Sequence, residues 1–153
     1  MQKGGNMASR SLQLETITPE SFAPFGTVID WTPELEARGV PFHILLRSEE
    51  PTGWRLAILK VAMRSVERME NHPDTEELFA PVGGSSVILV APAGDWDEDG
   101  VHAFLLDRPV SVGRGVWHGN LTLSDASTIL IAENLNVTAE YARLEEPLSA
   151  ALG

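Results

Sequence analysis

The chain contains 153 residues, 43% of them hydrophobic and 22% charged, which predicts one globular domain and excludes a disordered or collagenous chain. Twenty-two acidic residues against eleven basic ones give a formal net charge of −11, which opposes binding to nucleic acid or anionic membranes. The sequence has no cysteine, so disulfides, thiolate metal ligands and cysteine nucleophiles are excluded.

Residues 1–10 are predicted to be a flexible N-terminal tail, and residues 11–153 a single domain. The tail is polar and lacks the apolar stretch of a signal peptide. No apolar run in the sequence approaches the roughly 20 residues that a membrane-spanning helix needs. We therefore expect a cytoplasmic protein that binds neither membranes nor nucleic acid.

A short helix over residues 19–24 is the first predicted element. Thr18 can cap its first turn, and Pro19 suits the first helical position. Glu20 adds an acidic side chain to the first turn, and Gly26 is the predicted C-terminal cap.

After this helix the sequence changes to short β-type runs separated by turn residues. The predicted strands are residues 27–30, 41–47, 55–63, 66–70, 77–81, 86–91, 102–106, 111–112 and 128–133. Residues 86–91 and 128–132 are apolar on both alternating faces, which is typical of strands covered on both sides. The segment 138–152, with its Ala, Glu and Leu, predicts a second short helix. The regular spacing of strands and turns favours an all-β sandwich or barrel.

Of the four histidines, His72 has the most suggestive surroundings. Glu70 and His72 lie two residues apart, so both project from one face of a strand, and a turn then leads to Glu77. Three potential ligands thus converge on one strand–turn–strand unit. The same spacing also fits exposed acids on a surface hairpin. His43 and His102 have no acidic or histidine residue two positions before or after them and are interpreted as structural.

A second cluster ends at His118. Gly113 and Gly115 predict a sharp turn that delivers His118 to the start of a strand. Its neighbour Trp117 must point to the opposite face, where it is interpreted as a packing residue. Arg114 fits either an anion-binding role or a solvated loop charge.

Together the two clusters resemble the paired motifs of the cupin superfamily. Glu70, His72, Glu77 and residues 81–84 fit the first motif, with Glu70 in place of its first histidine. Residues 113–118 fit the second motif, with glycine in place of its proline. The resemblance implies a cupin-type double-stranded β-helix, a jelly-roll barrel, with one or two short helices.

A narrower resemblance covers roughly residues 12–135. The segments 18–29, 70–81 and 115–118 are similar, in order and spacing, to the ureidoglycolate lyase family, long called ureidoglycolate hydrolases. This resemblance implies a homodimeric carbon–nitrogen lyase of purine (allantoin) catabolism that releases urea and glyoxylate from ureidoglycolate. The open alternatives are a cupin that only binds a small molecule, a cupin enzyme of different specificity and a structural or regulatory cupin dimer.

The chain differs from this family at four positions. Glu77 stands where members carry glutamine, and Asn71 replaces an arginine. Val112 replaces a tyrosine, and Gly119 replaces a second histidine.

If the family reaction holds, the site must bind a small anionic substrate. A divalent ion such as nickel, manganese or zinc has four predicted ligands: Glu70, His72, Glu77 and His118. Glu77 is the predicted general base, and His72 and His118 complete the predicted catalytic set. Lys60 and Arg114 are the predicted cations for the substrate, although each also fits a solvated surface charge.

Overall fold

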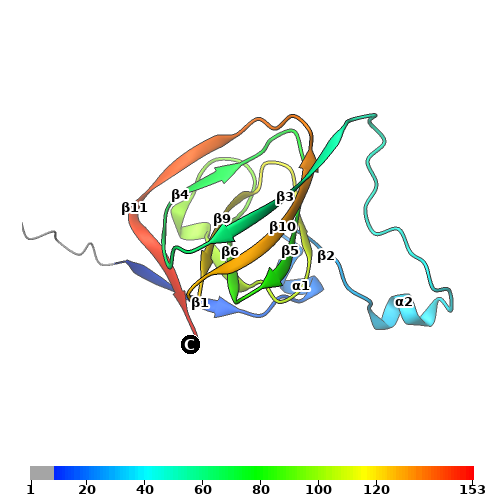
Figure 1. Ribbon diagram of the computed structural model, residues 1–153, viewed down its shortest axis with the longest axis horizontal. Coiled ribbons are helices and arrows are strands. Elements are labelled where there is room, and N and C mark those ends of the chain that lie inside the picture. Colours follow the sequence, from blue (N-terminus) through cyan, green and yellow to red (C-terminus); the bar gives the residue numbers. More distant parts are fainter. Residues whose placement is uncertain (1–8) are drawn as a thin grey trace, which may run out of the picture.

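The computed structural model describes residues 9–153, which form two β-sheets and two short α-helices (Figure 1). The predicted all-β barrel with one or two short helices is confirmed. Of the predicted tail, residues 1–8 lie outside the described residues, and Arg10 belongs to the first strand. None of the helices in residues 9–153 is long and apolar enough to cross a membrane.

The first sheet closes on itself. Its strands, in spatial order, are β1 (Arg10–Glu15), β11 (Glu140–Ala151), β4 (Val66–Asn71), β9 (Trp117–Thr122), β6 (Ser86–Ala91) and β7 (His102–Leu105). β1 pairs in parallel with both β11 and β7, and this pairing closes the sheet. One hydrophobic cluster, which includes Met69, Leu89 and Leu121, lies on one face of this sheet.

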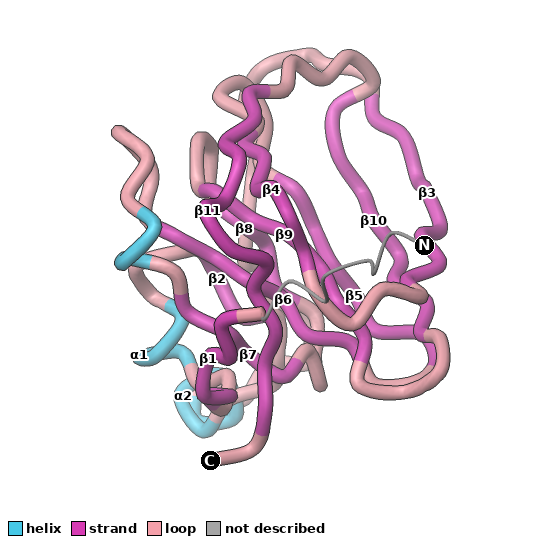
Figure 2. The backbone as a smooth tube through the Cα atoms, turned by 90° about the vertical axis from the view of Figure 1, so that its left-hand side faces the viewer, coloured by secondary structure: helices cyan, strands magenta, loops and turns pink. Residues whose placement is uncertain are grey.

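The second sheet is open. Its strands, in spatial order, are β2 (Gly26–Val28), β8 (Val110–Val112), β5 (Glu77–Gly83), β10 (Ser127–Asn134) and β3 (Trp54–Val61). In Figure 2, β10 and β3 lie side by side at one edge of the molecule. A second cluster joins the two sheets, with Phe79 and Ile129 from the open sheet packed among Ile88, Val90 and Phe104 of the closed one.

The helices are short. α1 (Pro19–Phe22) has the predicted cap, because the Thr18 hydroxyl accepts a hydrogen bond from the Ser21 amide at 3.0 Å. The prediction that Gly26 caps the C-terminus of this helix is wrong. Gly26 begins β2, where a Cβ would collide with the Ser111 carbonyl. α2 (Pro33–Ala37) and the 3-10 turn η1 (Glu98–Gly100) were not predicted.

Three other predictions are wrong. Segment 138–152 contains not a helix but β11, because pairing with β1 and β4 overrides its helix propensity. Residues 41–47 do not form a strand, because no strand of the described chain pairs with them. Strand 86–91 is buried throughout, as predicted, but on β10 Ile129 is buried while Leu130 is partly buried, so β10 is fully covered on neither of its faces along its whole length. β1 was not assigned as a strand from the sequence, whereas the strand predicted to start at His118 is β9.

Candidate active site

The first site segment is the predicted strand–turn–strand unit. Glu70 lies on β4, His72 directly follows that strand, and Glu77 begins β5. His72 and Glu77 are buried, whereas the Glu70 side chain is 38% exposed. The unit therefore buries His72 and Glu77 and leaves Glu70 partly exposed, so it is not a surface hairpin of exposed acids.

The second site segment is the glycine turn before β9. Gly115 has φ +75°, a left-handed conformation that glycine adopts without strain, and its amide donates to the His72 carbonyl at 3.0 Å. His118 then lies directly opposite Glu70 in the β4–β9 pairing. Trp117 points to the other face, where it is buried and donates from Nε1 to the Gly94 carbonyl.

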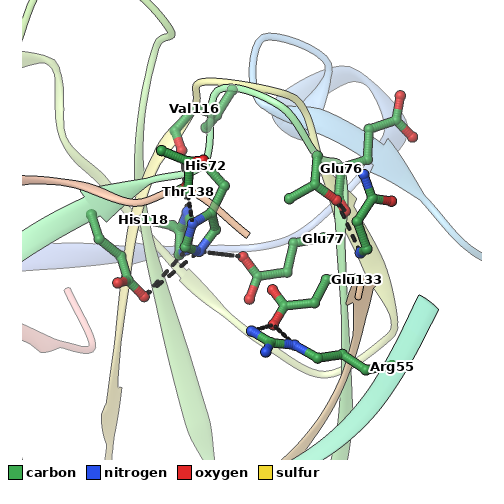
Figure 3. A network of polar contacts seen from close by, with 11 residues as sticks. Arg55, His72, Glu76, Glu77, Val116, His118, Glu133 and Thr138 are labelled. Carbon is green, nitrogen blue, oxygen red and sulfur yellow. Dashed lines mark hydrogen bonds and ion pairs between the residues drawn. The ribbon is translucent and has the colours of Figure 1, made fainter. Parts of the chain in front are cut away.

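The two histidines meet Glu77 inside the protein, as Figure 3 shows. Glu77 Oε2 lies 3.1 Å from His72 Nε2 and 3.2 Å from His118 Nε2. Glu70 Oε1 lies farther away, 3.9 Å from His72 Nε2 and 3.7 Å from His118 Nε2. Two imidazoles and two carboxylates from distant parts of the chain thus form one cluster.

Backbone carbonyls orient both rings. His72 Nδ1 lies 3.1 Å from the Thr138 carbonyl, and His118 Nδ1 lies 3.1 Å from the Val116 carbonyl. A carbonyl can only accept, so Nδ1 carries the proton in each ring and Nε2 is the atom presented to the cluster. This is the arrangement by which proteins fix histidine ligands of metal ions.

The cluster perturbs the acidity of its own members. Burial alone raises the pKa of Glu77, but the contacts with His118 and His72 outweigh burial and lower that pKa to about 2. Burial alone would lower the pKa of His118, but Glu70 and Glu77 raise it to about 9. Burial opposes the charged form of His72 as well, yet Glu77 raises the pKa of this imidazole above its ordinary value. At neutral pH, ionised Glu77 therefore faces a protonated His118.

This donor set fits a divalent metal ion. One ligand atom each from Glu70, His72 and His118 lie within 4.8 Å of one another. Among residues 9–153, the buried atoms Glu77 Oε2 and His118 Nε2 contact each other at 3.2 Å but make no contact with hydrogen-bond geometry. Imidazole nitrogen and carboxylate oxygen are ligands that zinc, nickel and manganese accept. Glu70, His72 and His118 can therefore hold such an ion, with the Glu77 carboxylate beside it.

Beyond Glu77, Figure 3 shows a second charged pair formed by Glu133 and Arg55. The Arg55 guanidinium donates to Glu133 Oε1 from Nε at 2.9 Å and from Nη2 at 2.7 Å. Burial raises the pKa of Glu133, Arg55 opposes that rise, and Glu77 adds to it. The site thus contains a third carboxylate, and Arg55 neutralises it.

A cleft of about 280 Å³ reaches the cluster at Glu70 and His118. Lys60 and Arg68 contribute to its lining, together with Asn120, whose buried Nδ2 has no hydrogen-bond partner among residues 9–153. Arg114 is exposed on the turn before β9 and is not part of this lining. Of the two predicted substrate cations, only Lys60 borders the cleft.

Sequence reasoning missed Arg55, Arg68, Asn120 and Glu133. Arg55 and Glu133 are direct cross-strand partners in the β3–β10 pairing. Glu133 also continues the inward alternation of Ile129, and a charge at such a position was the available signal.

Comparisons with known proteins give consistent results. The family model described as ureidoglycolate lyase matches residues 9–148. The ureidoglycolate lyase of Burkholderia cepacia is 36% identical over 135 residues, covering 75% of this chain and 74% of the relative. The ureidoglycolate lyase of Pseudomonas fluorescens (strain Pf0-1) is 31% identical over 141 residues, covering 81% of this chain and 84% of the relative.

Among solved structures the likeness is distant. The dTDP sugar isomerase from Desulfovibrio desulfuricans G20 aligns with 80% of this chain and 83% of its own, at 18% identity and a TM-score of 0.45.

Proposed function

The chain belongs to the ureidoglycolate lyase family, and we propose that it cleaves ureidoglycolate into glyoxylate and urea. The observation that carries this proposal is the meeting of His72, His118, Glu70 and Glu77 at the end of one cleft. Each of these residues lies within the part of the chain that matches the family.

The reaction needs a base and a positive site for an anion. The central carbon of ureidoglycolate carries a carboxylate, a hydroxyl and a urea nitrogen. When the hydroxyl loses its proton, its electrons form the carbonyl of glyoxylate and the carbon–nitrogen bond breaks. The departing nitrogen then takes up one proton to become urea, so the proton lost and the proton gained balance.

Glu70, His72 and His118 would hold a divalent ion such as nickel, manganese or zinc, and Glu77 would stay off the ion. Such an ion would supply positive charge for the carboxylate and hydroxyl oxygens and lower the pKa of the hydroxyl. This charge matters because the chain carries −11 overall and the cluster contains only acidic and imidazole groups. An anionic substrate would otherwise meet two carboxylates at the end of the cleft.

Glu77 is the proposed general base. It is ionised at neutral pH, as a base must be, because His72 and His118 lower its pKa. The same carboxyl can return its proton to the departing nitrogen, which requires no second acid.

Lys60 at the cleft is the proposed partner of the substrate carboxylate, and Arg68 borders the same space. We place the enzyme in the cytoplasm and propose that it is a homodimer. The exposed apolar side chains of β3, Trp54, Leu56 and Ile58, support an interface between copies.

The test is urea and glyoxylate release from ureidoglycolate by the purified protein, together with its metal content. His72→Ala and His118→Ala should each abolish turnover while the protein stays folded. His43→Ala and His102→Ala are matched controls outside the cluster and should keep wild-type rates. Full activity in both cluster variants would overturn the proposal, and ureidoglycolate binding without turnover would favour a binding protein instead.

A further inference from the structure

The strand β3 leaves one edge open. Within residues 9–153 it pairs only with β10, so the backbone N–H and C=O groups of its other edge have no strand partner. Trp54 is 69% exposed and Ile58 63% exposed, and both point to the face of the sheet that the core does not cover. A long apolar edge strand of this kind is a template for pairing with another chain.

Residues 41–47 have strand-forming side chains but no pairing strand within residues 9–153. Residues 41–47 are rich in apolar and β-branched or aromatic side chains, and their pattern predicts a strand, yet they belong to no helix or strand. Phe42 is 77% exposed and Ile44 59% exposed. Figure 1 shows this stretch, between α2 and β3, running outside the two sheets. Its apolar side chains are therefore not buried within its own chain.

We propose that residues 41–47 of one copy pair as a β-strand with the open edge of β3 in a second copy. The exchange is reciprocal, so two segments fill two edges and a closed two-fold dimer results. This pairing is independent of the proposed reaction. It rests on the proposed homodimer and names the segments that form the dimer interface. The sequence preference for a strand at 41–47 is then satisfied in the assembly.

Charge favours a second copy of this chain as the partner. Two chains of net charge −11 repel each other, so contact is easiest where no acidic residue lies. Neither segment 41–47 nor β3 contains Asp or Glu, although the chain has 22 of these residues. The two segments carry only basic charges, at Arg47, Arg55 and Lys60.

The exposed area also matches a dimer. The exposed large apolar side chains of the two segments are Phe42, Ile44, Leu45, Leu46, Trp54, Leu56, Ile58 and Leu59. With roughly 150–250 Å² for a whole aromatic side chain and less for Leu or Ile, they expose on the order of 800 Å². A stable interface of standard size buries about 800 Å² on each partner.

The pairing would also brace the active site. β3 contributes Leu59 and Lys60 to the cleft and Arg55 to the contact with Glu133. A strand added to its edge would fix the position of all three.

Cross-linking tests the contact directly, because the chain has no cysteine of its own. Ile44→Cys and Ile58→Cys are placed in two chains that carry different tags and are co-expressed, and a short bis-maleimide is added. The expected product joins one chain of each kind. Products that join only two Ile58→Cys chains would show β3 pairing with itself, and a lack of mixed product in a dimer would overturn the pairing.

Sedimentation analysis separates this contact from dimerisation as such. Phe42→Asp combined with Ile44→Asp should weaken the dimer by roughly 100-fold or more, because charged side chains replace two apolar ones that the contact would bury. Leu152→Asp, at an exposed apolar residue outside both segments, is the matched control and should leave the dimer intact. A wild-type monomer would overturn both the homodimer and the pairing, whereas an undiminished dimer of the Asp variant would overturn the pairing alone.

Discussion

Replacing Glu77 with Gln removes a charge from the centre of the cluster while keeping the side-chain volume. The pKa of Glu77 is lowered from 4.5 to about 2, which corresponds to about 3 kcal/mol of stabilisation of the folded state. The raised pKa of His118 reflects the same contact from the other side and is not added to this value. Glu77→Gln should therefore lower the melting temperature of chelator-treated protein by roughly 6–12 °C.

The pH dependence gives this prediction its sign. Glu77 has a lowered pKa, so its contribution is present above pH 4.5 and is lost as the pH falls toward 2. His118 has a raised pKa, so the same contribution is present below pH 6.5 and is lost as the pH rises through about 9. The stability difference between wild type and variant should be largest between pH 4.5 and 6.5 and should decrease on both sides.

The assay is thermal denaturation of both proteins after chelation, followed across this pH range. Glu76→Gln changes the neighbouring exposed acid and should alter stability by no more than about 0.5 kcal/mol. Equal melting temperatures at pH 5.5, or a difference that does not vary with pH, would refute the reasoning.

Two further predictions concern metal binding and the glycine turn. Because His118 and His72 have raised pKa values, zinc or nickel binding at pH 7 should release protons. Calorimetry in buffers of different ionisation enthalpy measures this release. A binding heat that does not depend on the buffer would contradict the prediction. Gly115→Ala should lower the free energy of unfolding by about 1–2 kcal/mol, because alanine is strained at φ +75°, and should lower urea release by displacing His118. Gly94→Ala, at another glycine with positive φ (+110°), is the control and should lose stability but keep activity.

The site segments were predictable because each is encoded locally. Glu70, His72 and Glu77 lie within eight residues of one another, and alternation along a strand suffices to place the first two on one face. The glycine turn before His118 is equally local. Only the family resemblance predicted that these two segments meet. The pairing of β4 with β9 cannot be predicted from either segment alone.

Other features depend on contacts that a single segment does not encode. The helix predicted near the C-terminus failed because Ala, Glu and Leu fit a helix locally, while β11 is held by β1 and β4 on its two sides. Pro147, which disfavours a helix, lies where the β11–β4 register shifts, between Arg143 and Leu148. Arg55 and Glu133 were missed because their contact depends on the register of β3 against β10.

The closed sheet has a consequence for how the chain folds during synthesis. β1 finds its partner β11 only when the last strand has left the ribosome, since Arg10 pairs with Leu148. Contacts so distant in sequence carry a large loop-closure entropy, so we expect this seam to form late. Both segments of the His/Glu cluster lie between the two strands of the seam, so the nascent polypeptide can assemble them before its barrel is sealed.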